Sequence, residues 1–311
     1  MNRKTSNRIT ARFFGLAITI VLLMPSLHCC KSPKEDNRSD SEIALEVLPT
    51  ERGVTVLFNG TDLSGWYTYL RPPEPTSMVE GLQKEEGKYV KPLGLNNDPL
   101  HVFSVVKEDG KPAIRISGEV FGVLITEKEY ENYHLSVEYK WGDQKYPPRM
   151  ENKRDSGILY HSVGKEGAKG GAWMRSVELQ VQQGDTGDLW CVDSTTTRVR
   201  ATRPDENERF RYDPQAPFQT IDMRGERYCK RSEDFEKDKG QWNQVDLYVY
   251  QGESIHVVNG RKNMHLTDIG QIINGEVIAL NKGKIQLQSE GAEIFYRNIT
   301  LWPITELPEV E

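Results

Sequence analysis

The sequence predicts an all-β domain, a sandwich of antiparallel strands with little helix, on three observations. Short apolar or alternating runs recur along the chain and are separated by turn residues. No long segment repeats its apolar residues with the 3.6-residue period of an amphipathic helix. The chain has 311 residues, and all-β domains often fold as one unit at this length. We expect a single domain over residues 51–305, followed by a short tail over 306–311.

The expected strands follow one another at short intervals. They lie at residues 55–58, 102–106, 113–116, 122–126, 133–141, 157–161, 176–182, 244–250 and 254–258. The run 133–141 alternates apolar and polar side chains, which is typical of a strand with one buried face. Asn259-Gly260 is a strong signal for a two-residue hairpin turn. Two irregular stretches, 70–100 and 198–240, predict long loops.

A hairpin is expected near the C-terminus. Residues 285–288 alternate Ile, Gln, Leu and Gln, so one face of that strand is polar. Residues 289–291 turn the chain, and a second strand follows over 292–302. A row of long polar side chains on an exposed sheet face is a common means of binding sugars and other polyols.

The N-terminus predicts a lipid-anchored protein. A basic leader precedes an apolar run over 13–24 that is too short to span a bilayer comfortably. Leu27 lies three residues before Cys30, which resembles a bacterial lipoprotein signal with an acylated cysteine after the cleavage point. We expect a signal peptide over 1–29, a lipid on Cys30 and a polar tether over 30–50. Acylation of Cys29 and a plain secretory signal are the alternatives.

This leader predicts a bacterial cell-envelope protein, anchored in the outer membrane and facing the periplasm or the cell surface. The net charge is −6 and no basic stripe is concentrated anywhere, so we expect no nucleic-acid partner. An oxidising compartment permits a disulfide between Cys191 and Cys229. Their spacing does not decide between that bond and two free thiols.

The sequence predicts no dedicated metal site. It contains no Cys-x-x-Cys pair, no His-Glu-x-x-His helix and no acid-rich calcium loop. We therefore name no metal ligands and no certain cofactor. A divalent cation that prefers oxygen ligands stays open as an assistant to catalysis.

Several motifs, in their order along the chain, resemble the 3-keto-disaccharide hydrolase family. They are LFNGTDLSGW at 57–66, DSGI at 155–158, VELQV at 177–181, QWN at 241–243, VNG at 258–260, GKIQLQ at 283–288 and YRNI at 296–299. The resemblance spans about residues 52–304. It implies a concanavalin A-like jelly roll of two curved antiparallel sheets with a concave, sugar-facing surface, and the strand pattern agrees with that fold.

The resemblance also implies an enzyme that cleaves oligosaccharides or other glycosides carrying a ketone at C3. The ketone acidifies the C2 hydrogen, so that a base can remove it and the C1 substituent can then leave. This chemistry requires a base, a group that stabilises the enolate oxygen and an acid for the leaving group, but no redox cofactor. The alternative expectation is a non-catalytic carbohydrate-binding lipoprotein.

Two carboxylates and a histidine are the candidates for proton transfer. Glu178 is the first candidate for the base, and it shares the polar face of its strand with Gln180, which would bind sugar hydroxyls. Asp155 is the candidate second carboxylate, with a turn-capping aspartate as the alternative. His161 follows in the same strand and suits proton transfer near neutral pH.

Four further side chains complete the expected site. Arg297 is the candidate electrophile because its guanidinium can hold an enolate oxygen, although a salt bridge that clamps the last strand is the alternative. Gln288 and Lys140 are expected to contact the sugar, and Trp173, in a Gly-rich loop, is expected to stack on it. We predict that these groups meet with Glu178 inside one hollow.

Overall fold

The structure, a computed structural model, describes residues 53–310. All regular elements in this range are β-strands, and none of the range forms a helix that could cross a membrane. The all-β prediction is therefore confirmed. The predicted signal peptide, the lipid site at Cys30 and the tether over 30–50 lie outside the described residues.

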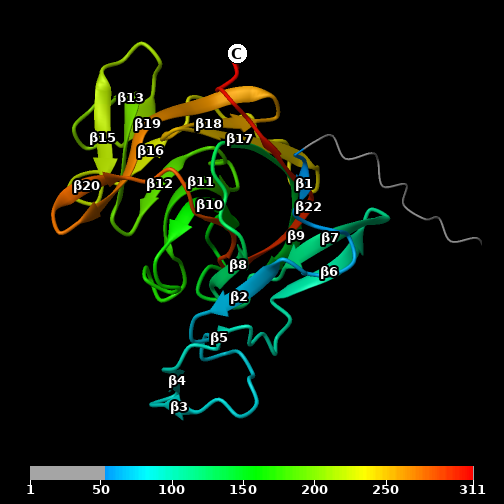
Figure 1. Cartoon of the computed structure of the whole chain (residues 1–311). Coiled ribbons are helices and arrows are strands. Elements are labelled where there is room, and N and C mark those ends of the chain that lie inside the picture. Colours follow the sequence, from blue (N-terminus) through cyan, green and yellow to red (C-terminus); the bar gives the residue numbers. More distant parts are fainter. Residues whose placement is uncertain (1–52, 311) are drawn as a thin grey trace, which may run out of the picture. The chain divides into compact units, whose positions relative to one another are not determined.

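Apart from one small hairpin, the strands form two largely antiparallel sheets that are joined to each other at one edge (Figure 1). The first sheet contains, in spatial order, β6 (Phe103–Glu108), β7 (Lys111–Ile116), β22 (Ala292–Pro303), β9 (Tyr133–Lys145), β17 (Asn243–Tyr250), β18 (Glu253–Val258), β19 (Arg261–Ile273), β13 (Thr195–Thr202) and β15 (Phe218–Asp222). Two short strands lie beside it, β1 (Thr55–Val56) on β22 and β20 (Glu276–Ala279) on β19.

The second sheet carries the site. It contains, in spatial order, β5 (Gly94–Leu95), β2 (Trp66–Leu70), β8 (Gly122–Thr126), β21 (Lys284–Ser289), β10 (Asp155–Val163), β11 (Arg175–Gln182), β12 (Leu189–Val192), β16 (Tyr228–Lys230) and β14 (Phe210–Tyr212). The pair β14–β16 is parallel, and β14 also pairs with β13. A separate small hairpin joins β3 (Lys84–Glu85) and β4 (Lys88–Tyr89).

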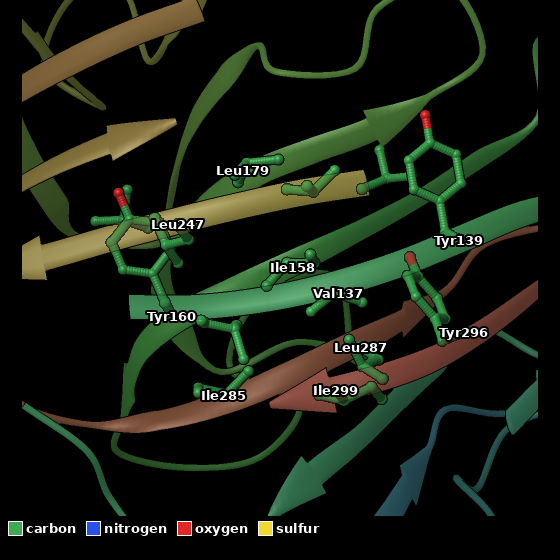
Figure 2. Packing of buried hydrophobic residues seen from close by; sticks show 14 of the residues in the cluster. Val137, Tyr139, Ile158, Tyr160, Leu179, Leu247, Ile285, Leu287, Tyr296 and Ile299 are labelled. Carbon is green, nitrogen blue, oxygen red and sulfur yellow. The ribbon is translucent and has the colours of Figure 1, made fainter. Parts of the chain in front are cut away.

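The hydrophobic core lies between the two sheets because alternate side chains of each central strand face inward. Val137 and Tyr139 of β9 belong to the same buried cluster as Ile158 of β10 and Leu287 of β21. Figure 2 shows these side chains packed between strands of both sheets. Their neighbours along each strand must therefore point away from the core.

The register of the second sheet aligns four of these outward positions across adjacent strands. Val123 of β8 is opposite Gln288 of β21, and Gly157 of β10 is opposite Gln180 of β11. Gln288 and Gly157 lie side by side as well, because their neighbours Leu287 and Ile158 are paired. Glu178 comes two residues before Gln180 on the same face. We call this the Glu178 face.

The region 198–240 is more regular than expected, because parts of it form strands β13 to β16. Its last segment closes one end of the sandwich. There the Glu236 carboxylate accepts hydrogen bonds from the Tyr139 hydroxyl at 2.8 Å and from Trp141 Nε1 at 2.7 Å. Cys191 and Cys229, on neighbouring strands, are both buried and both free.

Candidate active site

Glu178 is a buried carboxylate without a hydrogen bond. The residue is 5% exposed, and its Oε1 atom is buried without a partner. The carboxylate lies over Gly157, where a Cβ atom would come within 2.1 Å of Oε1. Burial raises the pKa of Glu178 well above its usual range, and the negative charges of Asp155 and Glu290 raise it further. A buried carboxylate in this condition is a candidate for a functional role, because leaving it without a partner is costly.

Asp155 and Glu290 share one arginine. Arg149 contacts Asp155 Oδ2 at 2.5 Å through Nη2 and Glu290 Oε1 at 2.8 Å through Nη1. Burial nevertheless raises the pKa of Asp155 to about 6 and that of Glu290 to about 8. The structure thus brings Asp155 close enough to act on Glu178, as predicted, and adds Glu290 to the same carboxylate group.

Asp155 also orients the glutamines of β11. Gln180 donates to Asp155 Oδ1 from Nε2 at 3.2 Å, and Gln182 donates to Oδ2 at 2.6 Å. Since the amide nitrogen of Gln180 is engaged, its oxygen is left without a donor. A carboxylate that caps a turn accepts hydrogen bonds from nearby backbone N–H groups. The contacts of the Asp155 carboxylate are instead all with side chains.

Unpartnered polar atoms accumulate on this face. Of the 11 buried side-chain atoms without a hydrogen bond among the described residues, five belong to the Glu178 face or its rim. They are Glu178 Oε1, Gln180 Oε1, Gln288 Oε1, Arg149 Nε and Trp173 Nε1. Three acceptors on strands β11 and β21 and two donors on the neighbouring loops match the mixed hydrogen-bonding demand of a polyol.

Trp173 lies at the β8 side of the face. It packs against Val123 and Ile125, whose side chains point away from the core between the sheets. Its ring is 6.4 Å from that of Phe121, over which the Arg71 guanidinium lies at 3.7 Å. The Gly-rich loop therefore folds back across the second sheet and places a half-buried indole beside the row that contains Gln288.

The opposite side of the face carries a second tryptophan. Trp190 of β12 is the register partner of Glu178 and is half-buried. The Arg227 guanidinium lies 4.7 Å over its ring, and the ring of Tyr228 is 4.5 Å away. Arg227 is close enough to Glu178 to lower the pKa of that carboxyl, although burial remains the larger effect.

Arg297 does not join this site, and the prediction that it meets Glu178 is wrong. Arg297 lies on β22 of the first sheet, where it contacts Glu138 at 2.7 Å and stacks 3.6 Å over Trp242. Its strand neighbour Tyr296 faces the core, so the guanidinium points away from the second sheet. The strand period alone could not show which of the two sheets β22 belongs to.

The prediction that Lys140 meets Glu178 is wrong for the same reason. It lies on β9 of the first sheet, and its ammonium is engaged by Glu108 and, at 2.8 Å, by Asp109. A hollow of about 370 Å³ borders Lys140 and Trp141 on that sheet, remote from the residues of the Glu178 face. Lys140 therefore has a structural ion-pair role there.

His161 is also separated from the carboxylates. It sits at a bulge in β10 with a φ of 49°, is fully buried, and has its ring 5.4 Å from that of the core residue Tyr160. Burial alone lowers its pKa to about 3, and no carboxylate contributes to that shift. The bulge interrupts the strict alternation along β10 on which the sequence prediction for His161 depended.

The match to known families covers nearly all of the described structure. The sequence profile of the family described as 3-keto-alpha-glucoside-1,2-lyase-like domain matches residues 53–301. This chain belongs to that family. The match includes every strand that builds the Glu178 face. No curated protein matches the chain.

Several solved structures resemble this lyase-like domain. Two putative glycosyl hydrolases from Parabacteroides distasonis are 20% and 18% identical, with TM-scores of 0.40 and 0.38. These alignments cover 81% and 64% of this chain and 94% and 90% of the other chains. A carbohydrate-binding module, CBM66 from Bacillus subtilis, is 10% identical over 64% of this chain and 91% of that chain, with a TM-score of 0.37.

Sequence reasoning missed two residues of the candidate site, Arg149 and Arg227. Both lie in segments without a clear strand pattern, so no period placed them on either sheet. Within residues 53–310, no group of three or more His, Cys, Asp or Glu side chains could hold a metal ion.

Proposed function

We propose that this protein cleaves glycosides of 3-keto sugars by elimination across C1 and C2, with Glu178 as the base. The family description supports this reaction class. The observation that carries the assignment is the buried Glu178 carboxylate, which lies over bare backbone at Gly157 without any hydrogen-bond partner. A base near neutral pH needs a raised pKa, and this environment supplies one.

The reaction proceeds in two steps. Glu178 takes the C2 proton, the C–H electron pair forms the C2=C3 double bond, and negative charge develops on the C3 oxygen. The ketone then re-forms while the C1–O bond breaks, and its electron pair leaves with the glycosidic oxygen, which is protonated. The products are a sugar with a C1=C2 double bond conjugated to the ketone and a free alcohol.

The carboxyl groups of Asp155 and Glu290 are suited to protonating the leaving glycosidic oxygen. Because burial raises the pKa of Glu290 to about 8, this group can take up and give back a proton near neutral pH. Arg149 holds it beside Asp155, since it donates a hydrogen bond to Glu290 and forms an ion pair with Asp155. We assign the proton for the leaving oxygen to this pair and the binding of sugar hydroxyls to Gln180 and Gln288.

The decisive experiment compares an oxidised with an unoxidised substrate. The protein should release the aglycone from a 3-keto-glucoside and not from the parent glucoside, and deuterium at C2 should slow release. Glu178→Gln should abolish turnover, while Glu276→Gln, an exposed strand glutamate on β20, should not. Equal rates on both substrates, or no isotope effect, would refute the mechanism.

Sugar binding without turnover would instead support the carbohydrate-binding alternative. In that case the wild-type protein and Glu178→Gln should bind the same 3-keto-glucoside with similar affinity, and neither should release the aglycone. The unpartnered amide oxygens of Gln180 and Gln288 would serve binding equally well in both cases. Only the burial of Glu178 distinguishes the catalytic assignment.

We also propose that the protein works at the bacterial cell envelope through a lipid on Cys30. The support for this proposal is the leader sequence, with its basic start, short apolar run and Leu27 three residues before the cysteine. Sugars reach such a location from outside the cell, which suits an enzyme that processes glycosides.

A further inference from the structure

Arg227 is a cation without a carboxylate partner beside the proposed base. Within residues 53–310 its guanidinium makes no ion pair or hydrogen bond, and it lies over the ring of Trp190. Other arginines around the second sheet are engaged. Arg149 is held by Asp155 and Glu290, and Arg71 by Glu74.

The fold holds this free cation next to Glu178. Trp190 is directly opposite Glu178 in the β11–β12 pairing, and both side chains lie on the outward face because Leu189 and Cys191 face the core. Arg227 lies over the Trp190 ring at 4.7 Å, a cation–π distance. A guanidinium stacked in this way keeps its N–H groups free to donate in the plane of the group.

A hydrogen-bond network behind Trp190 fixes the position of its ring. Tyr228 packs against Trp190 with 4.5 Å between ring centroids, and its hydroxyl donates to the Asp188 carboxylate. Arg231 donates to the same carboxylate from Nη1 at 2.9 Å. Asp188 is fully buried, and the backbone carbonyl of Arg227 accepts a hydrogen bond from Cys191 N at 2.8 Å, so both the ring support and the base of the arginine are held by the sheet.

We propose that Arg227 is a catalytic residue that binds the C3 oxygen of the substrate and stabilises the negative charge that develops there. This inference rests on the proposed 3-keto elimination. When Glu178 removes the C2 proton, the electron pair of that bond moves toward C3 and the charge appears on the ketone oxygen. A preorganised guanidinium stabilises such an oxyanion more than it stabilises the neutral ketone, which lowers the barrier.

The test compares Arg227→Gln with a matched arginine elsewhere. Arg261 is also stacked on a ring, that of Phe235 at 5.2 Å, and is likewise without a recorded ion pair. Arg227→Gln should lower kcat/KM on a 3-keto-glucoside by roughly 100- to 1,000-fold, the usual loss for one oxyanion donor. Arg261→Gln should stay within about threefold of wild type, since it touches no part of the Glu178 face.

Two further measurements separate catalysis from structural support. Added guanidinium ion should partly restore turnover in Arg227→Ala, and Trp190→Ala should lower kcat without removing the specificity for the oxidised substrate. Arg227→Gln should also move the acid limb of the rate profile to higher pH, because the guanidinium lowers the pKa of Glu178. A purely structural arginine would not produce these effects.

The outcomes distinguish this inference from the proposed function. If wild type cleaves the 3-keto-glucoside, Glu178→Gln is inactive and folded Arg227→Gln retains nearly full activity, the Arg227 assignment is wrong and the elimination stands. If wild type does not cleave the 3-keto-glucoside at all, the proposed function itself fails. Thermal unfolding of each variant shows whether a loss of activity reflects misfolding.

Discussion

At the scale of single residues, Glu178 and Gly157 form a unit. A carboxylate this deeply buried normally finds a hydrogen-bond donor, because an unpaired buried charge is strongly unfavourable. Here the space above Gly157 accepts the carboxylate, but the glycine offers no side-chain donor. The arrangement keeps Glu178 available for a ligand at the expense of stability, as is common at active sites.

Gly157→Ala should separate activity from stability. The new Cβ atom would meet Glu178 Oε1, the mobile end of a side chain, so the carboxylate must move while the strand stays intact. We expect at least a tenfold loss in kcat, in line with the cost of misplacing a catalytic group, and little change in Tm. Gly225→Ala, with no atom within 4 Å of its added Cβ, is the matched control. Unchanged turnover in Gly157→Ala would contradict the placement of the base.

Asp155→Asn should shift the pH dependence of catalysis. Glu178 acts as a base only when it is ionised, so kcat/KM should fall as the pH drops through the raised pKa of this group. The negative charge of Asp155 contributes to that rise, and its removal should move the acid limb to lower pH. Rate profiles of both proteins on one 3-keto-glucoside check the sign. A shift to higher pH would show that Asp155 does not act on Glu178 as a charge.

At the scale of strands, the first and second sheets divide the polar residues between stability and function. The outward side chains of β9 and β22 are joined into ion pairs, such as Arg297 with Glu138 and Lys140 with Asp109. The outward side chains of β11 and β21 keep unpartnered oxygens instead. Outward polarity alone therefore does not mark a site, whereas unsatisfied outward polarity does.

Arg297→Gln should affect stability and leave catalysis unchanged. The guanidinium links β22 to β9 through Glu138 and stacks on Trp242. Its loss should lower the free energy of unfolding by about 1–2 kcal/mol, the sum expected for a half-buried ion pair and a cation–π contact. Denaturant unfolding and kcat/KM on the same preparation test this directly. A large drop in kcat/KM with intact stability would show instead that Arg297 takes part in catalysis.

At the scale of the whole molecule, the sandwich presents the proposed site on one sheet and leaves the other sheet for structural contacts. The loops 146–154, 164–174 and 223–227 bring Arg149, Trp173 and Arg227 to the rim of the same sheet. A single sheet face can thus combine a base, a cation and a stacking ring that are far apart in the sequence.

The anchoring proposal concerns the complete chain and is tested in cells. Cys30→Ser should abolish labelling by a radioactive fatty acid and move the protein from the membrane fraction to the soluble fraction, because a lipid anchor adds about 0.8 kcal/mol of membrane affinity per buried CH₂. Cys29→Ser should leave both unchanged. The reverse pattern would assign the lipid to Cys29, and labelling of neither cysteine in the wild type would indicate a plain secretory signal.

The fold class, and several residues of the candidate site, could be predicted from the sequence. The two-residue period of the strands identified an all-β sandwich and placed Glu178 and Gln180 on one face, and Gln286 and Gln288 on another strand's polar face, because side-chain alternation is a local property of a strand. Asp155 and Trp173 were predicted as site residues because they lie close in sequence to those strands.

Which outward faces lie together depends on contacts between distant strands. Alternation shows that Arg297 and Lys140 point outward, but each sheet of a sandwich has its own outward face, and pairing between distant strands selects one of them. Contacts across the fold likewise determine the bulge at His161. They also determine the loops that place Arg149 and Arg227 at the edge of the second sheet. A period read along the chain contains no information about such contacts.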